Sequence, residues 1–224
     1  MAKNHGASRQ KKLAKQKAKR SEKRTDLARR SSNDPTIRLL RVADRPIVHA
    51  LIAEEIWEIG MGSAAIARKE SDGRLLYAAY LVDVYCLGVK DSFWDSVTTG
   101  EFEELVQKIE TTQTLRPVDP ACLAKIVNGA VEFARSFGFS PHPDFRHSGR
   151  LLEGIDSTTC PHEYVFGHDG KPLYIRGPNE SLELARAIGR RVAEANGNYF
   201  IPISGPGTAE FDDLQIDDSD DEGE

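Results

Sequence analysis

The apolar residues in the middle of the chain form two runs that are typical of β-strands. Residues 63–70 and 74–89 flank the turn residues Ser71, Asp72 and Gly73. Two such runs around a Gly-containing turn predict an antiparallel hairpin. The second run is long, aromatic and rich in β-branched residues, so we expect it to be a central strand. Side chains alternate along this strand, so Asp83 is expected on one face. The opposite face is expected to carry Leu76, Ala78, Tyr80, Val82 and Val84.

Four other segments have apolar residues at the spacing of a helix. Residues 45–59 carry isoleucine and leucine at such positions and end before Gly60, which predicts a helix. Thr98 and Glu101 have the spacing of a capping box, and Asn179 is expected to cap a helix further along. The apolar spacing, together with these caps, predicts three further helices, over 98–111, 119–137 and 182–193.

The remaining segments predict short strands and one ordered loop. We expect short strands near 36–42 and over 198–203, and a second hairpin around Asp169-Gly170. Residues 139–162 are rich in turn residues and predict a loop with one helical turn near Arg150. Helices and hairpins are interspersed without a regular βαβ alternation. The expected fold class is therefore α+β, a single domain with a mostly antiparallel sheet and packed helices.

Charge divides the chain into three parts. Residues 1–30 carry twelve Lys or Arg against two acids, a net charge of +10. Residues 208–224 carry nine Asp or Glu and no base, which leaves −6 on residues 31–207 for a total of −5. Low hydrophobicity and like-charge repulsion predict a disordered basic arm over 1–32 and a disordered acidic tail over 205–224. The globular domain is then expected over 33–204.

The sequence also indicates a compartment. The N-terminus has no apolar signal region, and no apolar run is long enough to span a bilayer. Three cysteines, Cys86, Cys122 and Cys160, provide no even disulfide framework. We therefore expect a soluble cytoplasmic protein in a reducing environment, without membrane contact.

One weak group of candidate catalytic residues lies at the long strand. Asp83 interrupts the apolar run, and Lys90 and Asp91 follow the strand. Burying a carboxylate is costly unless it is paired or does chemistry, so these residues are candidates for a magnesium site of a nuclease. A structural explanation is more frequent, in which Asp83 faces solvent or pairs with one basic side chain.

A second group consists of side chains of the types that bind zinc. The candidates are His142, Asp144, His147, Cys160, His162 and His168. Their spacing matches no standard zinc site, and the prolines among them favour turn residues that make local hydrogen bonds. We therefore expect this loop to be structural and no cofactor to be bound, with zinc or magnesium as the alternative. For Cys160 as a nucleophile, no nearby helix start is evident that would stabilise a thiolate.

Three segments of the sequence resemble a known group of proteins. The segments YLVDVYCLGVKDSFW, GFSPHPDF and FGHDGKPLYIRGPN are similar to an uncharacterised bacterial protein family whose members often begin with a Lys-rich arm. The resemblance covers residues 36–203. It implies a single cytoplasmic domain, and it brings no activity and no catalytic residues.

The charge pattern leads to the main functional hypothesis, a cytoplasmic accessory protein that binds RNA, DNA or the ribosome through its basic arm. The expected phosphate contacts are Lys11, Lys12, Lys15, Lys17, Lys19, Arg20, Lys23 and Arg24. The acidic tail is expected to compete for the arm as an internal polyanion. Two alternatives stay open, a metal-dependent hydrolase or nuclease and a protein-interaction module of a two-protein system.

Overall fold

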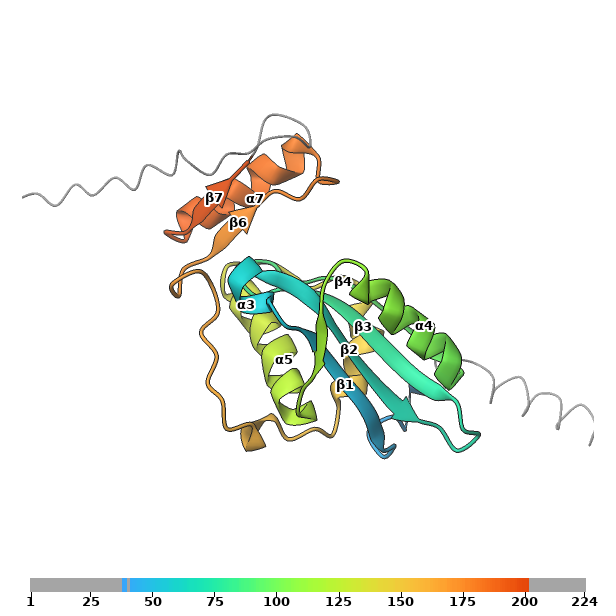
Figure 1. Ribbon diagram of the computed structural model, residues 1–224. Helices are drawn as coiled ribbons and strands as arrows, with labels where there is room; N and C mark the ends of the chain where they lie inside the picture. The colour runs from blue at the N-terminus through green and yellow to red at the C-terminus, as the bar shows by residue number, and fades with distance from the viewer. Residues whose placement is uncertain (1–37, 40, 202–224) are drawn as a thin grey trace, which may run out of the picture.

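The computed structural model describes residues 38–39 and 41–201, which form one α+β fold around an antiparallel sheet (Figure 1). The sheet has five strands in the order β4-β3-β2-β1-β5, and every neighbouring pair is antiparallel. The strands are β1 (Ile47–Ala53), β2 (Met61–Lys69), β3 (Leu75–Asp83), β4 (Gly88–Val97) and β5 (Leu115–Pro117). The predicted fold class is confirmed.

The hairpin predicted around Asp72-Gly73 joins β2 to β3. The Glu70 amide donates to the carbonyl of Arg74, and the Gly73 amide donates to the carbonyl of Glu70. Gly73 has a φ of +86°, a conformation that glycine adopts without the steric cost of a Cβ atom. The two strands then pair without a register shift from Lys69↔Leu75 to Met61↔Asp83.

Strand β3 is buried on both faces, as expected for a central strand. The face that carries Leu76 and Tyr80 packs against α5 (Pro120–Ser136) in the larger apolar cluster. The face that carries Tyr77 packs against Phe102 of α4 (Thr99–Glu110). Figure 1 shows these two helices on opposite sides of the sheet. Both helices match their predicted ranges, with the Thr98–Glu101 capping box and the Asp119 cap in place.

The predicted continuous strand over 74–89 is wrong after Asp83. The chain turns at residues 84–87 and returns as β4, a strand that the sequence pattern did not predict. Gly88 at the start of β4 has a φ of +69°. A Cβ atom there would lie 2.9 Å from the Ala130 carbonyl oxygen of α5, so glycine also permits the close approach of helix and strand.

The helix predicted over 45–59 is also wrong. Most of that segment is β1, and only a short helix, α3 (Ile56–Ile59), follows it. Apolar residues at Ile47, Leu51 and Ile52 fit a helix and a strand equally well. Hydrogen-bonded partners on both sides, β2 and β5, decide in favour of the strand.

The last part of the fold is a small βαβ unit. It consists of β6 (Leu173–Ile175), α7 (Leu182–Glu194) and β7 (Asn198–Phe200), and the two strands are parallel. The predicted hairpin around Asp169-Gly170 is therefore wrong, because the turn closes only one isolated bridge and β6 pairs with β7. Helix α7 is present as predicted, but its N-cap is Ser181 rather than Asn179.

This βαβ unit is attached to the sheet at the turn between β3 and β4. The Leu173 amide donates to the Tyr85 carbonyl, and Lys90 of β4 forms an ion pair of 2.7 Å with Glu180. Cys86 and Tyr174 share a buried apolar cluster with residues of α7. Figure 1 shows the unit beyond one end of the sheet.

The connection between α5 and β6 has the loop character predicted for it. It contains a short helix, α6 (Phe145–Ser148), and two 3₁₀ turns, η1 (Gly149–Leu152) and η2 (Ser157–Thr159). The strand expected near 36–42 is not seen, since residues 38 and 39 are helical and the chain turns after 41, while 36, 37 and 40 lie outside the described residues. No helix among the described residues is long and apolar enough to cross a membrane.

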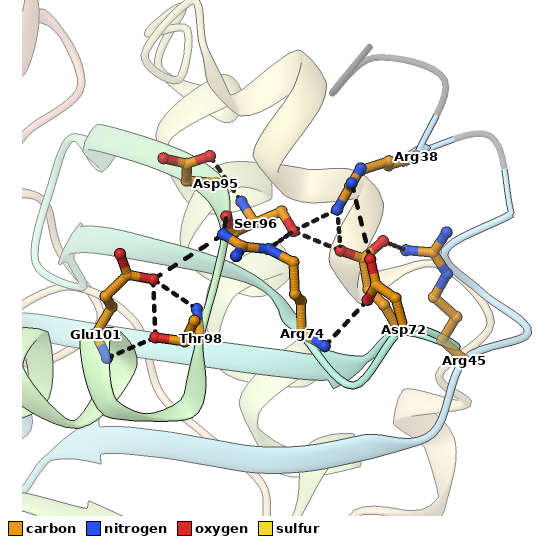
Figure 2. A network of polar contacts seen from close by, with 9 residues as sticks. Arg38, Arg45, Asp72, Arg74, Asp95, Ser96, Thr98 and Glu101 are labelled. Carbon is orange, nitrogen blue, oxygen red and sulfur yellow. Dashed lines mark hydrogen bonds and ion pairs between the residues drawn. The ribbon is translucent and has the colours of Figure 1, made fainter. Parts of the chain in front are cut away.

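A polar network fixes the entry of the chain to the end of the β2–β3 hairpin. The buried Glu70 carboxylate accepts from Arg38 and Arg45, each at 2.6 Å, and from the Ser96 hydroxyl. Figure 2 shows Arg38, Arg45 and Ser96 gathered at this end of the hairpin. Beside the network, the buried Arg68 guanidinium donates to four backbone carbonyls, those of Ala43, Arg45, Leu151 and Glu153.

We predict that Glu70→Ala destabilises the fold by about 2–4 kcal/mol, because removing one partner leaves two partly buried arginines without their counter-ion. Urea unfolding measures this loss. Asp72→Ala is the matched control, since the Asp72 side chain is 51% exposed and its ion pair with Arg38 spans 3.9 Å. That variant should lose less than about 1 kcal/mol. Equal losses in the two variants would contradict the role given to Glu70.

Candidate functional site

Asp83 stabilises a turn. Its Oδ1 atom accepts from the backbone amides of Tyr85 and Cys86, at 3.0 and 2.8 Å. These bonds hold the 84–87 turn, to which the βαβ unit is attached. A carboxylate at the end of an apolar strand is therefore explained by the local turn, as aspartate side chains commonly bond backbone amides two or three residues on.

The three candidate catalytic residues do not converge. Lys90 points toward the βαβ unit, where Glu180 accepts from it and from the Tyr174 hydroxyl. Asp91, the next residue along β4, is exposed and lies 3.8 Å from His142. Lys90 and Asp91 thus have different partners, Glu180 and His142.

The electrostatic surroundings of Asp83 are nevertheless unusual. Burial raises the pKa of its carboxyl group to about 6, although the amides of the turn and the nearby Lys90 favour the charged form. Burial likewise raises the pKa of the neighbouring Cys86 thiol to about 12. Cys86 is a buried free cysteine and stays protonated at neutral pH.

The six residues of the zinc-type group fall into two places. His142, Asp144 and His147 lie around α6, where the His142 ring accepts from the Asp144 amide and the His147 ring accepts from Arg146. The other three lie along the segment that leads to β6: Cys160, His162 and His168. Within the part of the chain that the structure describes, no group of three or more His, Cys, Asp or Glu residues could hold a metal ion.

The described fold has an open cleft of about 960 Å³. One wall is formed by Trp57 of α3 and by Tyr85 of the β3–β4 turn, and the floor by residues 116–119, which lead from β5 into α5. The other wall is an extended segment, residues 160–167, which we call the strap. His162 and His168 lie at this cleft, so two of the six predicted residues belong to it.

The strap lies against α5 and α3 through aromatic side chains. Tyr164 stacks on Trp57 with ring centroids 5.3 Å apart and planes 5° apart. Phe166 packs beside Gly129 of α5, where a Cβ atom would lie 2.5 Å from the Phe166 ring. Lys125 donates to the His162 carbonyl and pairs with Glu163. The strap follows α5 toward β6 in Figure 1 as an extended chain.

A disulfide bond joins the strap to α5. Cys122 and Cys160 are bonded across 38 residues of sequence, a disulfide that the three cysteines of the sequence did not indicate. Cys122 is the third residue of α5 and lines the cleft. A helix start therefore does lie next to Cys160, although the sequence gives no sign of it. Spacing alone could not pair these residues, because the strap folds back along α5 only in the complete fold.

The eight arm residues named as phosphate contacts, Lys11 to Arg24, lie outside the described residues. The features found in the described part of the chain are the cleft, the strap and the attachment of the βαβ unit. Neither the pair of aromatic residues Trp57 and Tyr164 nor the cleft itself was predicted, since the two rings are far apart in the sequence.

Comparison with known proteins gives no match: no family model, no curated protein and no solved structure matches this chain. The resemblance to an uncharacterised bacterial family stays a prediction.

We predict that Asp83→Asn stabilises the protein at pH 7 by about 2–3 kcal/mol, because asparagine keeps the acceptor for the turn amides and removes the buried charge. In the wild type the folded-state pKa of about 6 exceeds the ordinary value of 3.8, so the folded protein binds the proton more tightly than the unfolded chain. The stability that this group contributes is therefore present below about pH 4 and is lost as the pH rises through 6.

Urea unfolding of wild type and variant at pH values between 4 and 7 tests this prediction, and the advantage of the variant should shrink as the pH falls. Asp91→Asn on the same strand is the control and should change stability by less than about 0.5 kcal/mol, because its side chain is 65% exposed. An Asp83→Asn variant less stable than wild type at pH 7 would contradict the explanation.

Proposed function

We propose that this protein associates with nucleic acid, as free RNA or DNA or within the ribosome, through its N-terminal basic arm. The observation that carries the proposal is the charge of residues 1–30, with twelve Lys or Arg against two acids. Neutralising phosphates with such residues releases condensed counterions, which favours binding strongly at low salt.

The composition of the arm also indicates the kind of binding. Residues 1–30 contain no Phe, Trp or Tyr, so the arm has no aromatic side chain on which a base could stack. Contacts to phosphate carry no sequence information by themselves. Binding through the arm is therefore expected to be independent of sequence and steeply dependent on salt.

The described residues next to the two charged ends lie near opposite ends of β3. Arg38, which follows the arm, is bound to Glu70 just before β3, whereas Ile201, which precedes the tail, packs with Cys86 just after β3. The nine residues of β3 span eight steps of about 3.3 Å, so the two ends of the strand lie about 26 Å apart. The chain therefore enters and leaves the described fold near opposite ends of one strand.

The domain itself gives little attraction for phosphate, because residues 31–207 carry a net charge of −6. The acidic tail, with nine carboxylates, is the arm's concentrated competitor within the chain. The tail then weakens binding of the arm to weak targets, and it affects binding to strong polyanions less.

The hydrolase alternative has less support. Its strand candidates have other partners: Asp83 binds the turn amides, Lys90 binds Glu180 and Asp91 faces solvent. Cys160 is held in a disulfide bond.

We predict that deleting residues 1–30 abolishes binding to generic RNA and duplex DNA, while deleting residues 210–224 tightens it. Fluorescence anisotropy at two salt concentrations measures both effects. Removing the tail should strengthen binding most at low salt, where charges are screened least. The Debye length is about 30 Å at 0.01 M ionic strength, compared with about 8 Å at physiological ionic strength.

Two full-length variants of equal length but different charge separate the effect of charge from the effect of chain length. Replacing the eight cations from Lys11 to Arg24 by Gln should weaken binding nearly as much as the deletion, whereas replacing the lysines among them by Arg should preserve it. The proposal fails if the arm-deleted protein binds as tightly as the intact chain.

A further inference from the structure

The strap has no secondary structure of its own, since residues 160–166 belong to no helix or strand. One end is fixed by the Gly167 amide, which donates to the Val84 carbonyl, and the middle by the Trp57–Tyr164 stack. Phe166 beside Gly129 and the Lys125 bond to the His162 carbonyl add to these contacts. The Lys125–Glu163 ion pair contributes little, because the Glu163 side chain is 90% exposed. The Cys122–Cys160 bond is the one covalent link between the strap and α5 in the described fold.

The position of Cys122 suits it to thiol–disulfide exchange. It lies in the first turn of α5, after Asp119 and Pro120, where the free amides of a helix start favour a thiolate. Cys122 also lines the open cleft, but Cys122 and Cys160 are buried, with 2% and 4% of their surfaces exposed, so a dithiol reaches the bond only when the strap opens locally. A sulfur whose thiolate is stabilised is the better leaving group in exchange.

We propose that the Cys122–Cys160 disulfide is a redox-sensitive link, and that its reduction by a dithiol releases the strap from α5 and opens the cleft. The strap carries His162, Glu163, Tyr164 and Val165 into the cleft wall. Release therefore changes the lining and the shape of the cleft and leaves the sheet in place.

The reaction balances as a two-electron exchange. A thiolate of the dithiol attacks the sulfur of Cys160, the bond between the two protein sulfurs breaks, and Cys122 leaves as a thiolate and takes up a proton. The second thiol of the reductant then attacks the mixed disulfide on Cys160. The reductant ends as a disulfide, and the protein ends with two thiols. Cys86 takes no part, because it packs against Tyr174 in a different apolar cluster from the one that holds Cys122 and Cys160.

The inference does not depend on the function proposed for the basic arm, since neither the strap nor the disulfide includes an arm residue.

Hydrogen exchange of the full-length protein, oxidised and then treated with dithiothreitol, tests the proposal. Thiol counting on the oxidised protein should find one free cysteine, Cys86, and after treatment three. The two strap amides that form backbone hydrogen bonds, those of Cys160 and Gly167, should then exchange about tenfold faster or more, because the local opening that exposes them becomes easier. Amides of β3 should be unchanged.

Fluorescence provides a second readout. The chain has two tryptophans, so Trp94→Phe leaves Trp57 as the reporter. Its emission should change on reduction as Tyr164 leaves its face. Cys86→Ser is the matched control and should keep the full response, whereas Cys122→Ser/Cys160→Ser should behave as reduced protein with or without dithiothreitol.

Four results would overturn the proposal: three free thiols in the oxidised protein, a disulfide that resists dithiothreitol in the native state, strap exchange that is equal in both states, or loss of β3 protection on reduction. The last would mean that the bond supports the whole fold. If the double cysteine variant does not fold, the oxidised and reduced wild type still provide the comparison.

Discussion

The burial of β3 on both faces is the constraint on which the rest of the structure depends. A strand with apolar residues on both sides needs a cover for each, and α5 and α4 supply these covers. Both ends of β3 then become attachment points. The entry of the chain is bound at one end through Glu70, and the βαβ unit at the other end through the turn that Asp83 stabilises. The cleft and the strap lie beside this second end.

The elements that the sequence predicted well are those defined by neighbouring residues. The Asp72-Gly73 turn contains its own signal, because glycine there adopts a positive φ that other residues avoid. The capping box at Thr98 and the Asp119-Pro120 start likewise define α4 and α5 within a few residues. Turn geometry and helix caps are local interactions, so one sequence suffices to find them.

The elements that were missed are those decided by distant partners. Residues 45–59 form a strand because β2 and β5 lie on either side, and β6 pairs with β7 rather than with its sequence neighbour. The candidate site depends on such distances as well. The stack of Trp57 on Tyr164 and the Cys122–Cys160 bond join segments far apart in the chain. Asp83 stood out in the sequence for a good reason, its burial, but the turn that explains it became visible only in the fold.

The central functional claim is that an acidic domain is tethered to nucleic acid by the arm. Crosslinking of the full-length protein in cells, followed by its capture with and without nuclease and by mapping of the crosslinked peptides, tests this claim most directly. We expect nucleic acid to be recovered with the protein, to be lost on nuclease treatment, and to be attached to peptides from residues 1–30. Crosslinks concentrated on the cleft or elsewhere in the domain, or no recovered nucleic acid, would contradict it.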